Sequence, residues 1–116
     1  SEYYSVPPET ATLINEAKSK RKKVTVVGTS TVRTLETVMV SGFQITAKSG
    51  WTDKFIYPPY DFKMADKLIT NFHQPQSTLM MLVSAFANKD FIMDAYSEAI
   101  KKKYRFYSYG DAMLII

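Results

Sequence analysis

Two apolar runs of strand type each lead through a polar turn into a segment of helical periodicity, and this order most constrains the fold. The first run, at 24–27, is rich in valine and stops at Gly28, after which apolar side chains recur on one helical face over 32–39. The second run ends at 68–69, and an apolar helix is expected over 77–87. Strands that alternate with helices form sheets covered by helices, so we predict an α/β fold with a mixed or mainly parallel sheet.

Weaker patterns complete the expected order of elements. A first helix is expected from the Pro7–Pro8 pair to Ser19, because proline is tolerated in a first helical turn. A later helix is expected at 91–100. Further strands are expected at 43–47, 54–57, 62–64 and 112–116, with a turn at Ser49–Gly50.

The composition indicates one globular domain. Of the 116 residues, 46% are hydrophobic, 14% aromatic and 22% charged, whereas disordered chains combine few aromatic residues with a high net charge. The chain contains no cysteine and one histidine, so we expect neither a disulfide nor a metal site. No apolar run approaches the ~20 residues that span a bilayer, so we expect a cytoplasmic protein without membrane contact.

Two basic clusters account for most of the net charge of +4, and each follows an expected helix, at 18–23 and 101–105. Cations near a helix C-terminus are favoured by the helix dipole, by about 0.3–1 kcal/mol each, which is a structural explanation. Contact with nucleic-acid phosphates is the functional alternative, and it would make binding strongly dependent on salt. The candidate nucleic-acid contacts are Lys20, Arg21, Lys22 and Lys23.

The turn after Gly28 is the first candidate binding site. It lacks the lysine and the spacing of a P-loop, and it has a single glycine, so neither common nucleotide motif is present. Three consecutive hydroxyls here can cap the helix or bind an anionic group, and Arg33 can offer a bidentate fork to a carboxylate or phosphate. The alternative is a capped helix whose Arg33 pairs with Glu36 or Thr37 at the surface. The candidate substrate-binding residues are Thr29, Ser30, Thr31, Arg33 and Glu36, the last orienting the guanidinium.

The polar connection before the second helix is another candidate site, and it contains the single histidine. In open α/β sheets, ligands bind at the carboxyl ends of strands beside helix N-termini. The unperturbed pKa of histidine, about 6.5, suits proton transfer at neutral pH, so His73 is our candidate catalytic group. A structural histidine is the alternative. The candidate substrate-binding residues around it are Thr70, Asn71, Gln76 and Ser77.

A third polar cluster, at 107–111, precedes the final strand. Gly110 permits close backbone approach, and the carboxylate of Asp111 among aromatic neighbours can hold a cationic ligand. The alternative is that Asp111 caps a turn. We select Ser108 and Tyr109 as substrate-binding candidates and Asp111 as a second catalytic candidate, the rival of His73 as the base.

Several blocks spread over the whole chain form a specific set: Ser1-Glu2-Tyr3-Tyr4, Val27-Gly28-Thr29-Ser30-Thr31-Val32-Arg33-Thr34-Leu35-Glu36, Gly50-Trp51-Thr52-Asp53, Leu68-Ile69-Thr70-Asn71-Phe72-His73, Pro75, Ser77-Thr78-Leu79, Tyr104-Arg105-Phe106, Ser108 and Gly110-Asp111-Ala112-Met113-Leu114-Ile115. This set resembles the S-adenosylmethionine:tRNA ribosyltransferase-isomerase family of queuosine biosynthesis. Pro59, Gln74 and Asn88 depart from the usual pattern of that family, and none of them removes a reactive group.

The resemblance implies a reaction and a larger protein. Members of that family transfer and isomerise the ribosyl portion of S-adenosylmethionine onto the aminomethyl group of a 7-deazaguanine base at the tRNA wobble position, forming epoxyqueuosine and releasing adenine and methionine. S-adenosylmethionine is then a consumed substrate, no cofactor is expected, and tRNA is the partner. Family members are longer, with an N-terminal α/β portion and an inserted β-barrel that are absent here. Residues 1–116 are therefore expected to form the C-terminal portion of the α/β catalytic domain.

The same resemblance sets expectations for behaviour. The complete enzyme is expected to be a monomer, whereas this chain alone is expected to self-associate and to be inactive, because a tRNA interface and a two-part pocket need more surface. The alternative from a different class is a noncatalytic α/β module that binds nucleic acid through its basic clusters.

Overall fold

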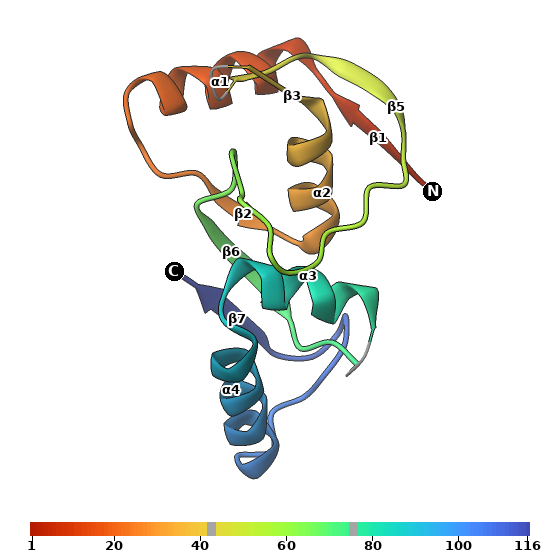
Figure 1. Ribbon diagram of the computed structural model, residues 1–116, viewed down its shortest axis with the longest axis vertical. Helices are drawn as coiled ribbons and strands as arrows, with labels where there is room; N and C mark the ends of the chain where they lie inside the picture. The colour runs from red at the N-terminus through yellow and green to blue at the C-terminus, as the bar shows by residue number, and fades with distance from the viewer. Residues whose placement is uncertain (42–43, 75–76) are drawn as a thin grey trace.

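The centre of the molecule is a three-stranded mixed sheet, seen in the computed structural model of Figure 1. Strand β2 (Thr25–Val27) pairs in parallel with β6 (Lys67–Asn71), and β6 pairs antiparallel with β7 (Ala112–Ile115). Val26 lies opposite Leu68, and both side chains are buried. The predicted α/β fold with a mixed sheet is confirmed.

The structure describes residues 1–41, 44–74 and 77–116. Predictions that involve three residues lie outside this part of the chain: Phe43, Pro75 and Gln76.

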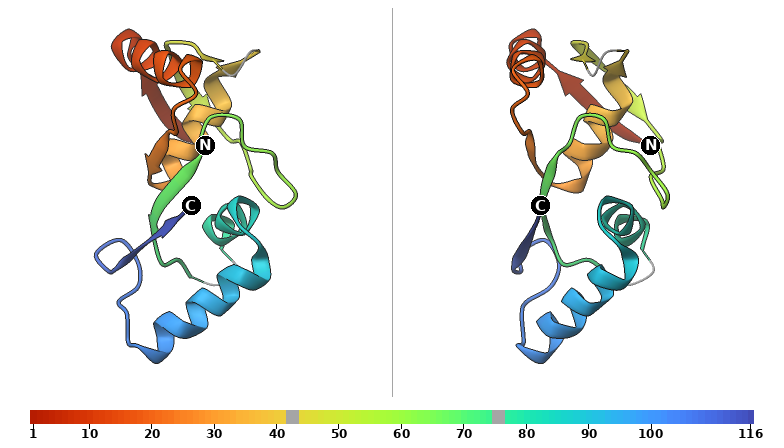
Figure 2. Two further views of the ribbon diagram at one scale, coloured as in Figure 1. Left: turned by 90° about the vertical axis from the view of Figure 1, so that its left-hand side faces the viewer. Right: turned by 60° about the vertical axis from the view of Figure 1, so that its left-hand side comes forward.

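Three helices lie on one side of this sheet (Figure 2): α2 (Thr29–Val38), α3 (Thr78–Phe86) and α4 (Lys89–Lys101). The opposite face leaves Val27 and Leu114 exposed by 66% and 54%, so the described helices cover the sheet on one face. Helix α3 begins where the Ser77 hydroxyl accepts a hydrogen bond from the Met80 amide, as expected of a serine N-cap. None of the described helices combines the length and the apolar character needed to cross a bilayer.

A two-stranded antiparallel ribbon lies beside the sheet. It consists of β1 (Glu2–Val6) and β5 (Lys48–Thr52), and α1 (Pro8–Ser19) follows directly after β1. Two short strands, β3 (Met39–Val40) and β4 (Gln44–Ile45), pair nearby, and the Asn15 side chain bonds both backbone groups of Ile45 at 2.9 and 2.7 Å. The first strand, which the sequence did not predict, places Glu2 next to the N-terminal turn of α2.

The predicted turn at Ser49–Gly50 is wrong, because both residues lie within β5. Gly50 pairs with Tyr4, and a Cβ added at Gly50 would lie 3.2 Å from the Tyr4 hydroxyl oxygen. The glycine therefore marks a close approach between two strands rather than a change of direction.

The predicted strands at 54–57 and 62–64 are also wrong, since the structure has neither. The backbone N–H groups of Lys63 and Met64 donate to the carboxylate of Glu36 on α2, at 3.1 and 2.9 Å. Because the Glu36 carboxylate already accepts from these N–H groups, they need no hydrogen bond to a neighbouring strand, and the segment forms a loop instead of a strand.

Candidate functional site

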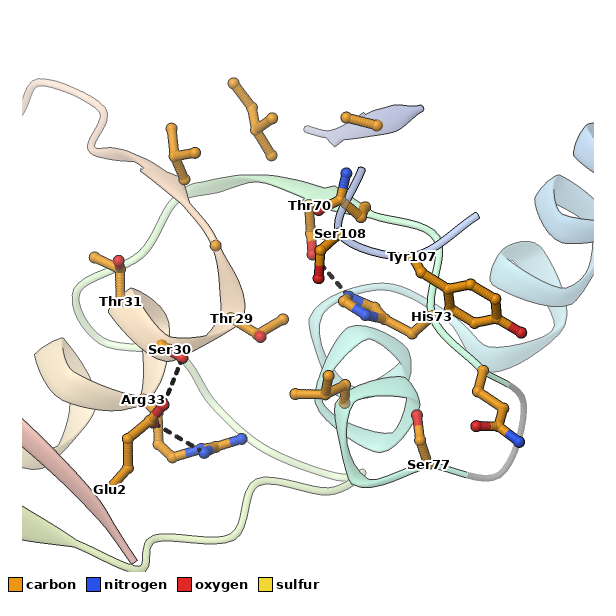
Figure 3. Close-up of a pocket in the computed structure, with 17 residues that line it drawn as sticks. Glu2, Thr29, Ser30, Thr31, Arg33, Thr70, His73, Ser77, Tyr107 and Ser108 are labelled. Carbon is orange, nitrogen blue, oxygen red and sulfur yellow. Dashed lines mark hydrogen bonds and ion pairs between the residues drawn. The ribbon is translucent and has the colours of Figure 1, made fainter. Parts of the chain in front are cut away.

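A pocket of about 770 Å³ lies where the two parallel strands end (Figure 3). The first turns of α2 and α3 line it, together with the end of β6 and the turn at 107–108. This is the edge at which the sequence predicted a site, because parallel strands end on the same side of a sheet and helix N-termini offer free N–H groups there. The structure brings together in this pocket the predicted residues Thr29, Ser30, Thr31, Arg33, Thr70, Asn71, His73, Ser77 and Ser108.

Gly28 makes the sharp passage from β2 into α2. Its φ of 94° lies in the region that favours glycine, and its N–H donates to the carbonyl of Ile69 at 2.8 Å. This bond holds the start of α2 against the end of β6. Gly28 is also the N-cap residue of α2, and no side chain accepts a capping hydrogen bond there. The hydroxyls of Thr29, Ser30 and Thr31 therefore do not cap the helix.

One end of the pocket is charged, and we call it the charged end: Glu2, Ser30 and Arg33. The Glu2 carboxylate accepts hydrogen bonds from the Ser30 hydroxyl at 2.8 Å and from the Arg33 guanidinium at 3.2 Å. The guanidinium is partly buried, with 19% of the side chain exposed, and its Nε has no hydrogen-bond partner among the described residues. A guanidinium has five N–H donors, so Arg33 keeps donors for an anionic ligand.

The prediction that Glu36 orients the Arg33 guanidinium is wrong, because the two side chains do not pair. Glu36 is buried, lies outside the pocket lining, and binds the loop at 60–64 through the amides of Lys63 and Met64 and the hydroxyl of Tyr60. Burial and the neighbouring Glu36 carboxylate raise the pKa of Tyr60 to about 12. Of the alternative pairings, the one with Glu36 is not found, since the guanidinium pairs with Glu2, whereas Thr37 donates its hydroxyl to the Arg33 carbonyl at 2.7 Å.

The opposite end of the pocket, which we call the neutral end, comprises Thr70, His73, Tyr107 and Ser108. A hydrogen bond of 2.8 Å joins the Thr70 hydroxyl to Nε2 of His73, and the His73 amide donates to the Tyr96 hydroxyl at 2.8 Å. Burial lowers the pKa of the His73 imidazole below its ordinary value of 6.5. The imidazole is therefore neutral at neutral pH, with one nitrogen able to donate a proton and the other able to accept one.

The turn at 105–111 is tied to the end of β6 by Asn71, whose side chain donates to the carbonyl of Asp111 at 3.1 Å. The Asp111 carboxylate accepts from the Arg105 amide at 2.7 Å, and it is not among the residues that line the pocket. Asp111 therefore caps the turn, as the alternative interpretation of the sequence predicted. Tyr109 also lies outside the lining, with 99% of the residue exposed.

Pocket residues that the sequence did not select include Glu2, Gln74, Leu79 and Tyr107. Glu2 comes from β1, which is 31 positions from Arg33, and only its pairing with β5 brings it there. No local pattern signals such a contact. Gln74 follows His73 within the predicted connection, and Leu79 lies in the first turn of the helix after it, so these positions in the sequence were the available signal.

The first basic cluster lies outside the pocket. Lys20, Arg21, Lys22 and Lys23 are exposed, and Lys20 pairs with Glu16 at 3.0 Å on the surface of α1. Arg21 has a φ of 58° where the helix ends. The second cluster follows α4, at the other end of the longest axis in Figure 1, so the fold does not join the two clusters into one patch.

The donors in the pocket suit an organic ligand with a carboxylate and an exchangeable proton. Among the described residues, no three His, Asp or Glu side chains gather as they would around a metal ion. The side chains that line this site offer hydroxyls, two amides, one imidazole and one ion pair.

Comparisons with known proteins agree with one another. The family model described as queuosine biosynthesis protein matches residues 1–115. The chain is 59% identical over 116 residues to the S-adenosylmethionine:tRNA ribosyltransferase-isomerase of Moorella thermoacetica. The matched region covers 100% of this chain and 34% of that protein. It is 57% identical over 115 residues to the protein of the same name from Natranaerobius thermophilus, with 99% of this chain and 34% of that protein covered.

A solved structure has the same fold. The crystal structure of S-adenosylmethionine tRNA ribosyltransferase from Thermotoga maritima matches with a TM-score of 0.92 and 53% identity, over 100% of this chain and 41% of that chain. The chain thus spans about a third of the length of the curated relatives it matches.

Proposed function

The chain belongs to the queuosine biosynthesis protein family, and on that premise we propose that it supplies a substrate pocket to a polypeptide with S-adenosylmethionine:tRNA ribosyltransferase-isomerase activity. In the proposed reaction a base, for which His73 is proposed below, takes a proton from the carbon beside the sulfonium, and adenine takes up a proton as its glycosidic bond breaks. The aminomethyl nitrogen of the tRNA base then bonds to the ribosyl carbon, and methionine leaves as the carbon–sulfur bond breaks. S-adenosylmethionine is consumed as a substrate.

The observation that supports this proposal is the division of one pocket into a charged end and a neutral end. The reaction needs groups that bind a charged amino-acid portion, and separate groups that transfer protons at the reacting sugar and the leaving base. A pocket of about 770 Å³ lies within the range of small-molecule sites, about 300–1,000 Å³.

Arg33 is proposed to bind the methionine carboxylate. Its guanidinium retains donors beyond the bond to Glu2, and a bidentate contact to a carboxylate is stronger than a neutral hydrogen bond. Glu2 lies 3.2 Å from that guanidinium and is the nearby counter-charge for the methionine ammonium or the sulfonium. Ser30 holds Glu2 in place through its hydroxyl.

His73 is proposed to transfer the proton. Its lowered pKa keeps the imidazole neutral at neutral pH, and Thr70 fixes one ring nitrogen by a hydrogen bond. The other nitrogen is then left for the substrate. Asp111, whose carboxylate binds the Arg105 amide, is the rival base only if the turn at 105–111 rearranges.

Lys20, Arg21, Lys22 and Lys23 are proposed to contact tRNA phosphates in a cytoplasmic, monomeric protein of the relatives' full length. All four are exposed. Replacing them together by alanine should weaken tRNA binding and make it less dependent on salt. In a plot of the logarithm of the binding constant against the logarithm of the salt concentration, the slope should become shallower by up to about 0.9 for each lost phosphate contact. The same change in Lys101, Lys102 and Lys103 is the matched comparison, and an unchanged slope in the first variant would leave only the helix-dipole role.

The experiment that tests the proposed function is an assay of adenine release. A polypeptide of the relatives' full length that contains this chain, hereafter the full-length polypeptide, is incubated with S-adenosylmethionine and tRNA carrying the aminomethyl-deazaguanine base. Release of adenine that depends on this tRNA is expected. Binding of tRNA without release would favour the noncatalytic nucleic-acid-binding module, and we expect the 116-residue chain alone to give no release.

A further inference from the structure

Tyr107 is a pocket residue to which the proposed chemistry gives no part. It lines the neutral end, 59% of the residue is exposed, and its backbone has a φ of 72°. We propose that Tyr107 is an aromatic platform on which a purine-like bicyclic base of a substrate stacks beside His73. This inference rests on the proposed function, since both proposed substrates contain such a base.

The backbone places Tyr107 directly against the His73 connection. The Tyr107 amide donates to the carbonyl of Phe72 at 2.9 Å, so the residue that precedes His73 is bonded to the platform residue. The Tyr107 carbonyl accepts from the Gly110 amide at 2.9 Å, which closes the turn behind it. Figure 3 shows that Tyr107 and His73 both lie at this end of the pocket.

The turn that presents Tyr107 is tightly built. A Cβ at Gly110 would lie 2.5 Å from the carbonyl oxygens of Arg105 and Phe106, so only glycine fits there. The Asp111 amide donates to the Arg105 carbonyl at 2.8 Å, and the Asp111 carboxylate accepts from the Arg105 amide. A ligand that meets this turn therefore meets a fixed surface.

Packing does not account for the position of the Tyr107 ring. Phe72, Tyr96 and Phe106 form an aromatic cluster with ring centroids 5.1–5.7 Å apart. Tyr107 contacts only the edge of this cluster, at 6.3 Å from Phe106, and its hydroxyl makes no hydrogen bond within the described residues. A bulky residue in the left-handed region is uncommon and costs conformational energy, and such residues concentrate at ligand sites.

The exposed ring suits a flat heterocycle. Stacking on an aromatic side chain needs only the π-face of a base, and it leaves the edges of that base free for proton transfer. Both adenine and 7-aminomethyl-7-deazaguanine have this shape. A base on Tyr107 would share this end of the pocket with His73, the group proposed to transfer a proton, and a departing adenine requires a proton.

Three variants of the full-length polypeptide test the platform. Tyr107→Phe keeps the ring, whereas Tyr107→Asn removes it and retains a residue type that tolerates a positive φ. Tyr57→Asn is the matched control, because Tyr57 is 52% exposed, contacts Phe55, and does not line the pocket. Should Tyr107→Asn fail to fold, as judged by its thermal melt, Tyr107→Gly takes its place.

Dissociation constants are measured for adenosine, 7-aminomethyl-7-deazaguanine and S-adenosylmethionine separately. Tyr107→Asn is expected to raise Kd for adenosine or for the deazaguanine by about 10–100-fold, and the one affected identifies which base stacks. Tyr107→Phe and Tyr57→Asn should remain within about twofold of wild type. Unchanged Kd values for both bases would overturn the proposal. Loss of affinity for S-adenosylmethionine alone would also overturn it, since the ring would then contact the sulfonium.

The adenine-release assay separates this inference from the proposed function. If wild type releases adenine while Tyr107→Asn keeps its affinity for both bases, the platform is wrong and the function stands. If wild type releases none, the binding measurements still decide whether Tyr107 stacks a base.

Discussion

The charged end and the neutral end of the pocket hold polar side chains in opposite ways. At the charged end, Glu2 and Arg33 form an ion pair across 3.2 Å. At the neutral end, burial lowers the pKa of His73, and the imidazole is held by a hydroxyl instead of a counter-ion. The first arrangement suits binding of a charged group, since it exchanges one ion pair for another. The second suits proton transfer, since a neutral imidazole can both give and take a proton.

The two ends also differ in how the chain assembles them. Thr70 and His73 are three positions apart in one connection, whereas Glu2 and Arg33 are 31 positions apart on different elements. The neutral end is therefore a local feature, and the charged end depends on the β1–β5 ribbon. Four predictions can break or sharpen this comparison.

The largest effect is expected at His73. In the full-length polypeptide, His73→Ala should lower the rate of the chemical step by about 10²–10⁴-fold, the usual contribution of general acid–base catalysis. Single-turnover kinetics measure this rate without interference from product release. The affinity for S-adenosylmethionine should change little, because the charged end is intact. A near-normal rate in the folded variant would transfer the role to another base, with Asp111 the first to examine.

Arg33 should affect binding rather than the chemical step. Arg33→Lys keeps the charge but loses the planar fork, so KM for S-adenosylmethionine should rise by roughly 10–100-fold, the equivalent of a charge-assisted hydrogen bond, with kcat nearly constant. Glu2→Gln tests the other half of the charged end, and it should raise the same KM. Wild-type kinetics for both substrates in Arg33→Lys would remove the charged end from substrate binding.

Glu36 tests whether a carboxylate beside the pocket belongs to it. Because Glu36 is buried and accepts two backbone N–H groups, Glu36→Gln should lower the free energy of unfolding by about 1–3 kcal/mol, with KM unchanged in the folded protein. The exposed Glu16, changed to Gln, is the control and should stay within about 0.5 kcal/mol. A raised KM without lost stability would place Glu36 in the charged end after all.

The sequence predicted the local features of fold and site and missed the non-local ones. Gly28 before a hydroxyl-rich turn and Ser77 before an apolar helix each mark a strand-to-helix connection through nearby residues, and both connections line the pocket. The partner of Arg33 is set by tertiary structure. Glu36 lies three positions away on the same helix, which made it the expected partner, but its carboxylate is taken by Lys63 and Met64.

The strands show the same division. The valine-rich run before Gly28 and the run that ends at 68–69 were predicted as strands, because buried parallel strands are apolar without interruption. β1 was not predicted, because Glu2–Val6 alternates weakly and its register depends on β5. Gly50 indicated a turn by its residue type. In the fold it packs closely against Tyr4, which is distant in the sequence, and this contact explains the glycine.

The smallest effect concerns pH and the stability that His73 confers. Burial lowers the pKa of His73 in the folded chain, so as pH falls below about 6.5 the unfolded chain takes up the proton first. The free energy of unfolding should therefore fall with decreasing pH through this range, by at most about 1.4 kcal/mol per pH unit from this one group, until the folded pKa is reached. In His73→Gln this contribution disappears, so urea unfolding of the 116-residue chain at several pH values should show a shallower loss of stability than wild type. Equal slopes in the two proteins would mean that the imidazole titrates alike in the folded and unfolded chains, and the neutral end would then carry a charge at mildly acidic pH just as the charged end does.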